Sequence, residues 1–226
     1  MTDPWAPDAR AGAWGGEREP FLKVAPIVAV LVIVMLAAHA ARVALHLSGA
    51  PFAFTPADLR LGRSWTLLSY QFVHGSWAHV LMNSAFTLAF GAPVARYLGG
   101  RAWPAAVFLV FFLSCGVIAA LGYFALSPRG GWALVGASGA ASGLMGAAAL
   151  LIEGHGVPGS PLGRTALGMT IGWVVINAVL GASGLTPGAA GVPVAWQAHI
   201  IGYAAGQALI VPAALLVGAR RQPRRR

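Results

Sequence analysis

The strongest constraint on this chain is a series of long apolar segments that are almost free of charge. Of its 226 residues, 58% are hydrophobic and 9% are charged, whereas a soluble domain carries about a quarter charged residues. A helix needs about 20 apolar residues to span a bilayer. The sequence therefore predicts an all-α, polytopic membrane protein whose six transmembrane helices run over 24–47, 78–97, 103–126, 138–153, 165–183 and 196–219.

The fourth predicted span, 138–153, is unusually short. A helix over these residues would be about 24 Å long, whereas the hydrocarbon core is about 30 Å thick. Its N-terminus at Ser138 must begin below one membrane surface, unless the bilayer thins there. Irregular backbone at that depth is tolerated only where protein buries it or water reaches it.

We expect the chain to divide into a polar cytoplasmic tail over 1–23, a membrane domain over 24–219 and a basic cytoplasmic tail over 220–226. No small-residue cleavage site clearly follows the first apolar run, so we interpret that run as a retained span. The net charge of +9 comes partly from the arginines of the basic tail, which directly follow an apolar helix. That position favours contact with anionic lipid and argues against nucleic-acid binding.

The distribution of lysine and arginine predicts the topology. With a cytoplasmic N-terminus, eleven of these residues lie inside and three lie outside, and the reverse topology inverts the ratio. We therefore expect both termini in the cytoplasm. The inside set is Arg10, Arg18, Lys23, Arg96, Arg101, Arg164, Arg220, Arg221, Arg224, Arg225 and Arg226, and the outside set is Arg60, Arg63 and Arg129.

This topology brings polar residues from three spans to one depth near the outer face. His79 and Asn83 open the second span, Ser138 opens the fourth and His199 opens the sixth. Serine is a weak nucleophile until a base takes its proton. Ser138 also begins a helix, where free N–H groups can stabilise a developing oxyanion. The set predicts nucleophilic catalysis inside a bilayer.

Small residues on two spans support a contact between Ser138 and His199. Gly202 and Gly206 lie one turn apart on the sixth span, and Gly139 and Gly143 have the same spacing on the fourth. Such faces let two helices approach closely. No carboxylate lies near enough to complete a triad, so we expect packing to orient the imidazole.

Structural roles are an alternative for each of these residues. Ser138 could be a small packing residue, His199 a histidine bonded to a backbone carbonyl, and His79 with Asn83 an interhelical hydrogen bond. His79 and Asn83 share one helix face, which also suits paired oxyanion donors. His74 could position the preceding loop or line a water path. We expect no metal and no cofactor, since no HExxH motif is present.

Taken in order, these motifs resemble the rhomboid family of intramembrane serine proteases over about 48–218. They are His79-xxx-Asn83, Gly136-Ala137-Ser138-Gly139 and Ala198-His199-xx-Gly202-xxx-Gly206. The resemblance implies that Ser138 is the nucleophile, His199 the general base, and His79 and Asn83 the oxyanion donors, with His74 and Gly136 in supporting roles. It implies membrane-protein substrates, single-span or polytopic, and location in a bacterial inner (cytoplasmic) membrane.

Two points stay open at this stage. Family members often carry an adjacent Trp-Arg pair in the first outer loop, whereas here Arg63 and Trp65 are separated by one residue. The alternative function is a catalytically silent scaffold that binds membrane helices. A transporter fits the sequence less well, because it would need ionisable residues along a path to both faces, whereas here the polar groups cluster on one side. For a protease, we expect substrate to arrive past the fifth span and the Gly/Pro-rich loop over 184–195.

Overall fold

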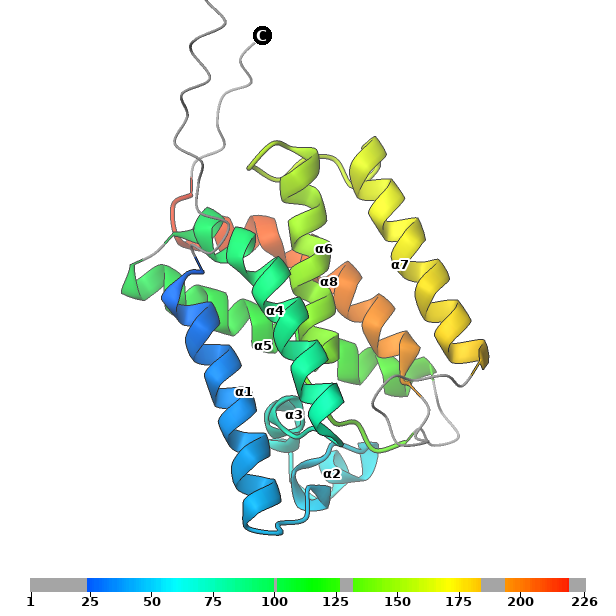
Figure 1. Cartoon of the computed structure of the whole chain (residues 1–226). Coiled ribbons are helices and arrows are strands. Elements are labelled where there is room, and N and C mark those ends of the chain that lie inside the picture. The colour runs from blue at the N-terminus through cyan, green and yellow to red at the C-terminus, as the bar shows by residue number, and fades with distance from the viewer. Residues whose placement is uncertain (1–23, 100, 127–131, 184–193, 220–226) are drawn as a thin grey trace, which may run out of the picture.

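A computed structural model describes residues 24–99, 101–126, 132–183 and 194–219 and shows a bundle of six long helices (Figure 1). Over these ranges there is no β-strand, only one antiparallel bridge between Phe54 and Leu134. The all-α prediction is therefore confirmed. The long helices are α1 (Pro26–Ala44), α4 (Trp77–Leu98), α5 (Ala102–Leu126), α6 (Ser138–Glu153), α7 (Arg164–Ser183) and α8 (Trp196–Leu216).

Five of the long helices are long and apolar enough to cross a membrane, and α6 is apolar but has only 16 residues. The predicted bundle of six apolar helices with a short fourth helix is confirmed. Two predicted spans are slightly too long, because α1 and α8 end before 47 and 219. His46, with φ 51°, and Gly218, with φ 64°, turn the chain there. The predicted tails over 1–23 and 220–226 lie outside the described residues.

Helix α6 forms the centre of the bundle. It contacts α4, α5, α7 and α8, and 12 of its 16 residues are buried. Most of these are glycine or alanine, so neighbouring backbones can approach closely. Helices α4, α6 and α8 all begin toward the end of the bundle that carries α2 (Pro56–Arg60) and α3 (Thr66–Ser69) (Figure 1). Their first turns therefore lie at one end of the molecule.

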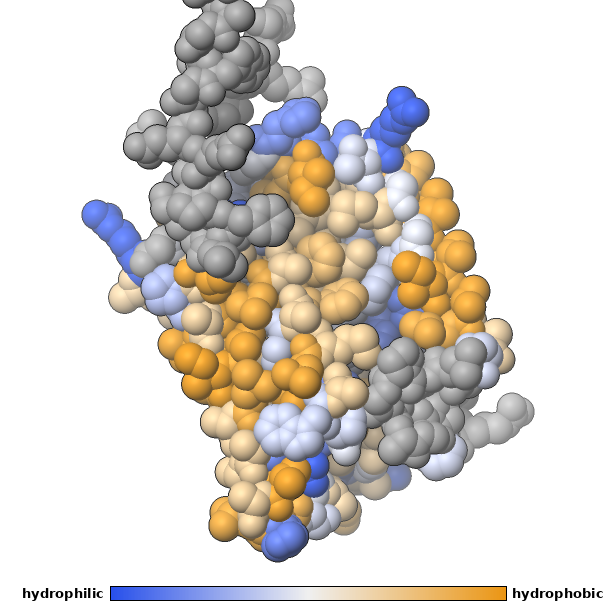
Figure 2. All heavy atoms as spheres, in the orientation of Figure 1, coloured by the Kyte–Doolittle hydropathy of each residue, from blue (hydrophilic) through white to orange (hydrophobic). Residues whose placement is uncertain are grey.

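Helix α7 lies at the edge of the bundle (Figure 1). Only Ala166 and Asn177 are buried along its length. On the face that Figure 2 shows, most of the hydrophobic surface lies along the length of the bundle, and more of the hydrophilic surface lies toward its two ends. This pattern is the one expected of a protein surrounded by lipid.

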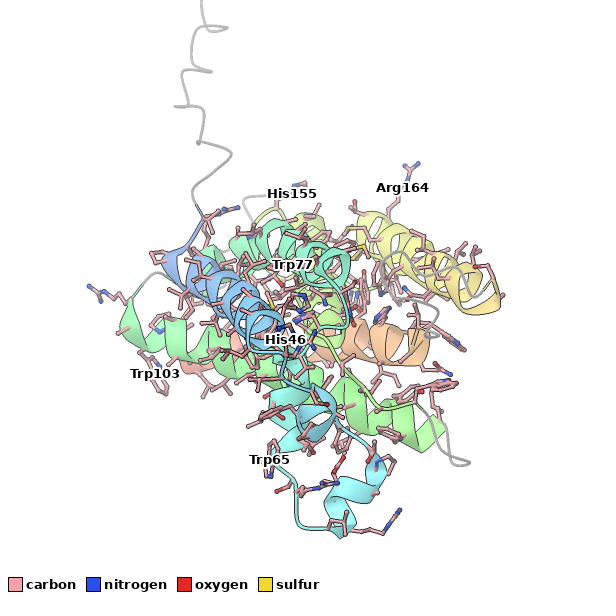
Figure 3. All side chains as sticks on the ribbon, turned by 60° about the horizontal axis from the view of Figure 1, so that its bottom comes forward. His46, Trp65, Trp77, Trp103, His155 and Arg164 are labelled. Carbon is pink, nitrogen blue, oxygen red and sulfur yellow. The ribbon has the colours of Figure 1, made fainter. Side chains whose placement is uncertain are left out.

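The segment between α1 and α4 folds into α2, α3 and the 3₁₀ turns η2 (Ala50–Phe52) and η3 (Tyr70–Phe72). Thr55 and Asp58 form a reciprocal capping box at the start of α2, and buried Asp58 pairs with Arg63. Trp65 packs edge-on against Phe52, with ring centroids 5.9 Å apart. Arg63 and Trp65, which are not adjacent in the sequence, thus both stabilise the lobe that α2 and α3 form. Trp65 lies on it, and His155 and Arg164 lie at the opposite side of the view (Figure 3).

Candidate active site

The first residue of α6 and the first turn of α8 meet at one end of the bundle. Ser138 Oγ lies 2.8 Å from His199 Nε2, within hydrogen-bonding distance. The two residues are 61 positions apart in the sequence. A neutral imidazole with its proton on Nδ1 can accept the serine proton at Nε2. The pair can therefore act as a nucleophile with its base.

Glycines hold α6 and α8 close enough for this contact. A Cβ atom added at Gly202 would collide with the carbonyl oxygen of Gly139, and one added at Gly206 would collide with that of Gly143. A Cβ at Gly146 would likewise strike the carbonyl oxygen of Tyr203. The small residues that the sequence analysis singled out thus lie at the backbone contact between the two helices.

Gly136 lies against the polar side chains of α4. Its φ of 102° is a conformation that favours glycine. A Cβ atom there would lie 2.6 Å from His79 Nε2 and 3.2 Å from Asn83 Nδ2. Both nitrogens therefore face the backbone two residues before Ser138. Asn83 is buried, and its Nδ2 has no hydrogen-bond partner, so a donor is available at this position.

The N-terminus of α6 contributes further donors. Ala137 precedes the helix, and no side chain caps it. The first N–H groups of a helix have no partner within the helix itself. The Ala137 N–H, which precedes the helix, donates a hydrogen bond to His74 Nε2 at 3.5 Å. The N–H groups that follow, from Ser138 onward, are placed where an anion beside the serine could accept from them.

His74 stands in the loop between η3 and α4 and is fully buried. Burial, together with the neighbouring His79 and His39, lowers the pKa of His74 to about 3. The ring is therefore neutral at physiological pH, and Nε2 can accept the Ala137 hydrogen bond. Arg42 of α1 fixes the same loop, because its Nη2 donates to the His74 carbonyl oxygen at 2.9 Å.

The strand-like segment before Ser138 is tied to the lobe formed by α2 and α3. The Gly136 N–H donates to the carbonyl oxygen of Tyr70 at 2.9 Å. Leu134 and Phe54 exchange two backbone hydrogen bonds at 2.9 and 3.1 Å. The Tyr70 hydroxyl in turn donates to the carbonyl oxygen of Gly116 on α5, at 2.7 Å. The lobe therefore fixes the backbone that leads into the serine.

Asn177 of α7 is a site residue that the sequence analysis missed. Its Oδ1 lies 2.8 Å from His199 Nδ1, on the side of the ring away from Ser138. The expectation that packing alone orients the imidazole was therefore wrong. A lone amide within an otherwise apolar span is a recognisable signal, although its partner could not be deduced from spacing. No group of three or more metal-type ligands occurs among the described residues.

Comparison with known proteins identifies the family of this chain. The model of the Rhomboid domain matches residues 61–215, which include His74, the α4 pair, Ser138, Asn177 and His199. No curated protein matches the chain. The match extends over more than half of the sequence and over helices α4 to α8. On this basis the chain belongs to the rhomboid family.

Proposed function

We propose that the protein is an intramembrane serine endopeptidase that cleaves transmembrane helices of other membrane proteins near the outer face. The observation that carries this proposal is the 2.8 Å contact between Ser138 Oγ and His199 Nε2 in a rhomboid domain. Serine and histidine at this distance form a nucleophile and base that need no cofactor.

In the proposed reaction, Ser138 Oγ attacks the carbonyl carbon of the scissile peptide while His199 Nε2 takes the hydroxyl proton. The tetrahedral intermediate then collapses, and the imidazolium returns that proton to the leaving amine. A water molecule, deprotonated by the same nitrogen, hydrolyses the resulting acyl-enzyme and restores the serine hydroxyl. Every proton taken up by His199 is thus returned within the cycle.

Three groups are suited to stabilise the oxyanion of the intermediate. They are the side-chain nitrogens of His79 and Asn83 and the first N–H groups of α6. The proposal is supported by their convergence near Gly136 and by the unpartnered state of Asn83 Nδ2. Donors that already point at the site before reaction avoid the energetic cost of reorientation.

Substrate access is proposed to pass α7. This helix has only two buried residues, so its displacement costs less buried surface than that of any central helix. A substrate helix must unwind locally, because its own hydrogen bonds and side chains shield the peptide bond. Small residues and helix-weakening neighbours at the outer end of the substrate helix are therefore the expected cleavage context. The protease is proposed to lie in the inner membrane, with both of its termini in the cytoplasm.

The test uses protein purified in detergent and in proteoliposomes, incubated with a tagged single-span substrate. Ser138→Ala and His199→Ala should both abolish cleavage. Ser142→Ala is a matched control, since Ser142 lies one turn further along α6 and its hydroxyl bonds to the Ser138 carbonyl oxygen. Substrate that binds to all variants and is cut by none would establish instead a silent scaffold that holds membrane helices.

A further inference from the structure

Asn177 connects the edge helix α7 to the proposed base. It is one of two buried residues on α7 and is fully inaccessible. Its Oδ1 lies 2.8 Å from His199 Nδ1. The neighbouring large side chains on this helix, Val174, Val175 and Ile176, are exposed. A polar residue is therefore buried on a helix that otherwise presents apolar side chains to the surroundings.

A second hydrogen bond fixes which atom of the amide faces the histidine. Asn177 Nδ2 donates to the carbonyl oxygen of Trp173, one turn earlier, at 2.9 Å. The amide cannot flip without losing this bond, so Oδ1 is the atom turned to the ring. An amide oxygen only accepts hydrogen bonds. The ring nitrogen opposite it must therefore carry the proton.

We infer that Asn177 is a positioning residue, which holds His199 with its proton on Nδ1 and so leaves Nε2 free to accept the proton of Ser138. The inference rests on the proposed protease function and completes it with a Ser–His–Asn chain across α6, α8 and α7. In the resting state His199 would thus be locked in the tautomer that general-base catalysis requires.

The membrane setting explains why an amide suits this position. A carboxylate buried among apolar helices loses its hydration, which is costly unless a full charge pairs with it. An amide provides the same acceptor geometry without a net charge. When His199 becomes protonated during the reaction, its Nδ1–H still has Asn177 Oδ1 as acceptor, so the ring need not rotate.

Further polar contacts hold α7 in this position against α8. Trp173 Nε1 donates to the carbonyl oxygen of His199 at 3.4 Å. Two turns before Asn177, the hydroxyls of Thr170 and Tyr203 lie 3.3 Å apart, and Gln207 Nε2 donates to Thr170 at 3.3 Å. Hydrophilic surface is visible in the hollow between α7 and the central helices (Figure 2). Of these links between α7 and α8, the one through Asn177 reaches the ring nitrogen of the base.

Three variants distinguish the effect of losing the Asn177 acceptor from the effect of weakening the packing of α7 against α8. Asn177→Leu keeps the branched shape of the side chain and removes the acceptor, whereas Asn177→Asp keeps an oxygen at the same place. Thr170→Val is the matched control: it breaks polar contacts between the same two helices without touching His199. Each protein is tested for cleavage, for covalent labelling of Ser138 by a fluorophosphonate, and for the ¹⁵N shifts of the His199 ring. The His199→Gln variant assigns the ring signals.

The parent should show Nδ1–H imidazole, and Asn177→Leu should lose that signature. In the same variant kcat should fall about 10- to 100-fold with little change in KM, the range typical when the hydrogen-bond partner that orients a metal-bound imidazole is removed. Asn177→Asp should keep the tautomer and restore much of kcat. Thr170→Val should keep both the parent tautomer and the parent kcat.

Two results would overturn the inference: a parent ring protonated on Nε2, or an Asn177→Leu ring that stays in the parent tautomer. The first needs no variant, so poor folding of Asn177→Leu does not prevent the test. If the parent neither cleaves substrate nor labels at Ser138, the proposed function fails, whereas the ring shifts still decide whether Asn177 sets the tautomer.

Discussion

The Cα of Gly202 on α8 packs directly against the carbonyl group of Gly139 on α6, with no room for a side chain between them. Gly139 follows Ser138, and Gly202 lies one turn after His199. This backbone contact therefore sets the separation of the two helices at the point where their side chains form the 2.8 Å hydrogen bond. The distance between Ser138 and His199 therefore depends on Gly202 having no side chain.

The first prediction concerns Gly202→Ala. The added methyl group must push α8 away from α6, because backbone atoms obstruct it and cannot rotate aside. Overpacking of this kind costs about 1–3 kcal/mol of stability, and the widened gap should reduce cleavage far more than the loss of stability explains. The measurements are cleavage rate and thermal unfolding in detergent.

Gly168→Ala on α7 is the control for Gly202→Ala. A Cβ atom there meets nothing within 4 Å, so the same substitution should leave activity and unfolding temperature nearly unchanged. Equal activity of Gly202→Ala and the parent would show that the helix separation does not govern the reaction.

The second prediction concerns Gly136→Ala. This substitution combines an unfavourable φ of 102° with a collision against His79 Nε2. It should abolish cleavage, because it displaces the proposed oxyanion donors as well as straining the chain. Gly62→Ala separates the two effects, since Gly62 has φ 71° and open space around it.

Gly62→Ala should cost only the conformational strain, about 1–2 kcal/mol, and should keep activity at a permissive temperature. Comparable losses of activity in the Gly62 and Gly136 variants would mean that backbone strain, and not the contact with α4, is responsible.

The sequence predicted the helices well because membrane spans have a simple physical signature. Long uncharged runs must form helices in a bilayer, and the small residues at Gly139, Gly143, Gly202 and Gly206 indicated which helices touch. The fourth span was predicted with the ends that the structure gives it, Ser138–Glu153. The ends of α1 and α8 were less well predicted, because hydrophobicity does not show where a residue such as His46 turns the chain.

The candidate site was predictable only in part. Ser138, His199, His79 and Asn83 stood out because each is polar at the opening of a span. Asn177 lies in the interior of its span, and its contact with His199 depends on the rotation of α7 about its own axis. Sequence periodicity does not define that rotation when nearly every residue is apolar. The partner of Arg63 likewise emerged only from the fold of the lobe.

The third prediction concerns Asn83→Ala. Asn83 Nδ2 is buried without a partner, so its removal should leave the unfolding temperature nearly unchanged. Loss of one oxyanion donor typically lowers kcat by about 100- to 1000-fold, and KM should change little. Kinetic assays with a soluble reporter of cleavage provide both constants.

Ser84→Ala provides the comparison for Asn83→Ala, because the Ser84 hydroxyl is also buried and unpartnered, one residue further along α4. That variant should keep its kcat. A large drop in unfolding temperature for Asn83→Ala with unchanged kcat would identify Asn83 as a structural residue.

The last prediction concerns the acid stability of the fold. Burial lowers the pKa of His74 from 6.5 to about 3, so between these values the unfolded chain binds a proton that the folded chain does not. The stabilisation by neutral His74 is complete above pH 6.5 and is lost as pH falls toward 3. One proton changes the free energy of unfolding by at most about 1.4 kcal/mol per pH unit. His74→Gln keeps an acceptor for the Ala137 N–H but does not titrate, so its unfolding free energy should depend less steeply on pH over this window. Denaturation curves in detergent from pH 4 to 8 measure the two slopes, and identical slopes would show that the pKa of His74 is the same in the folded and unfolded states.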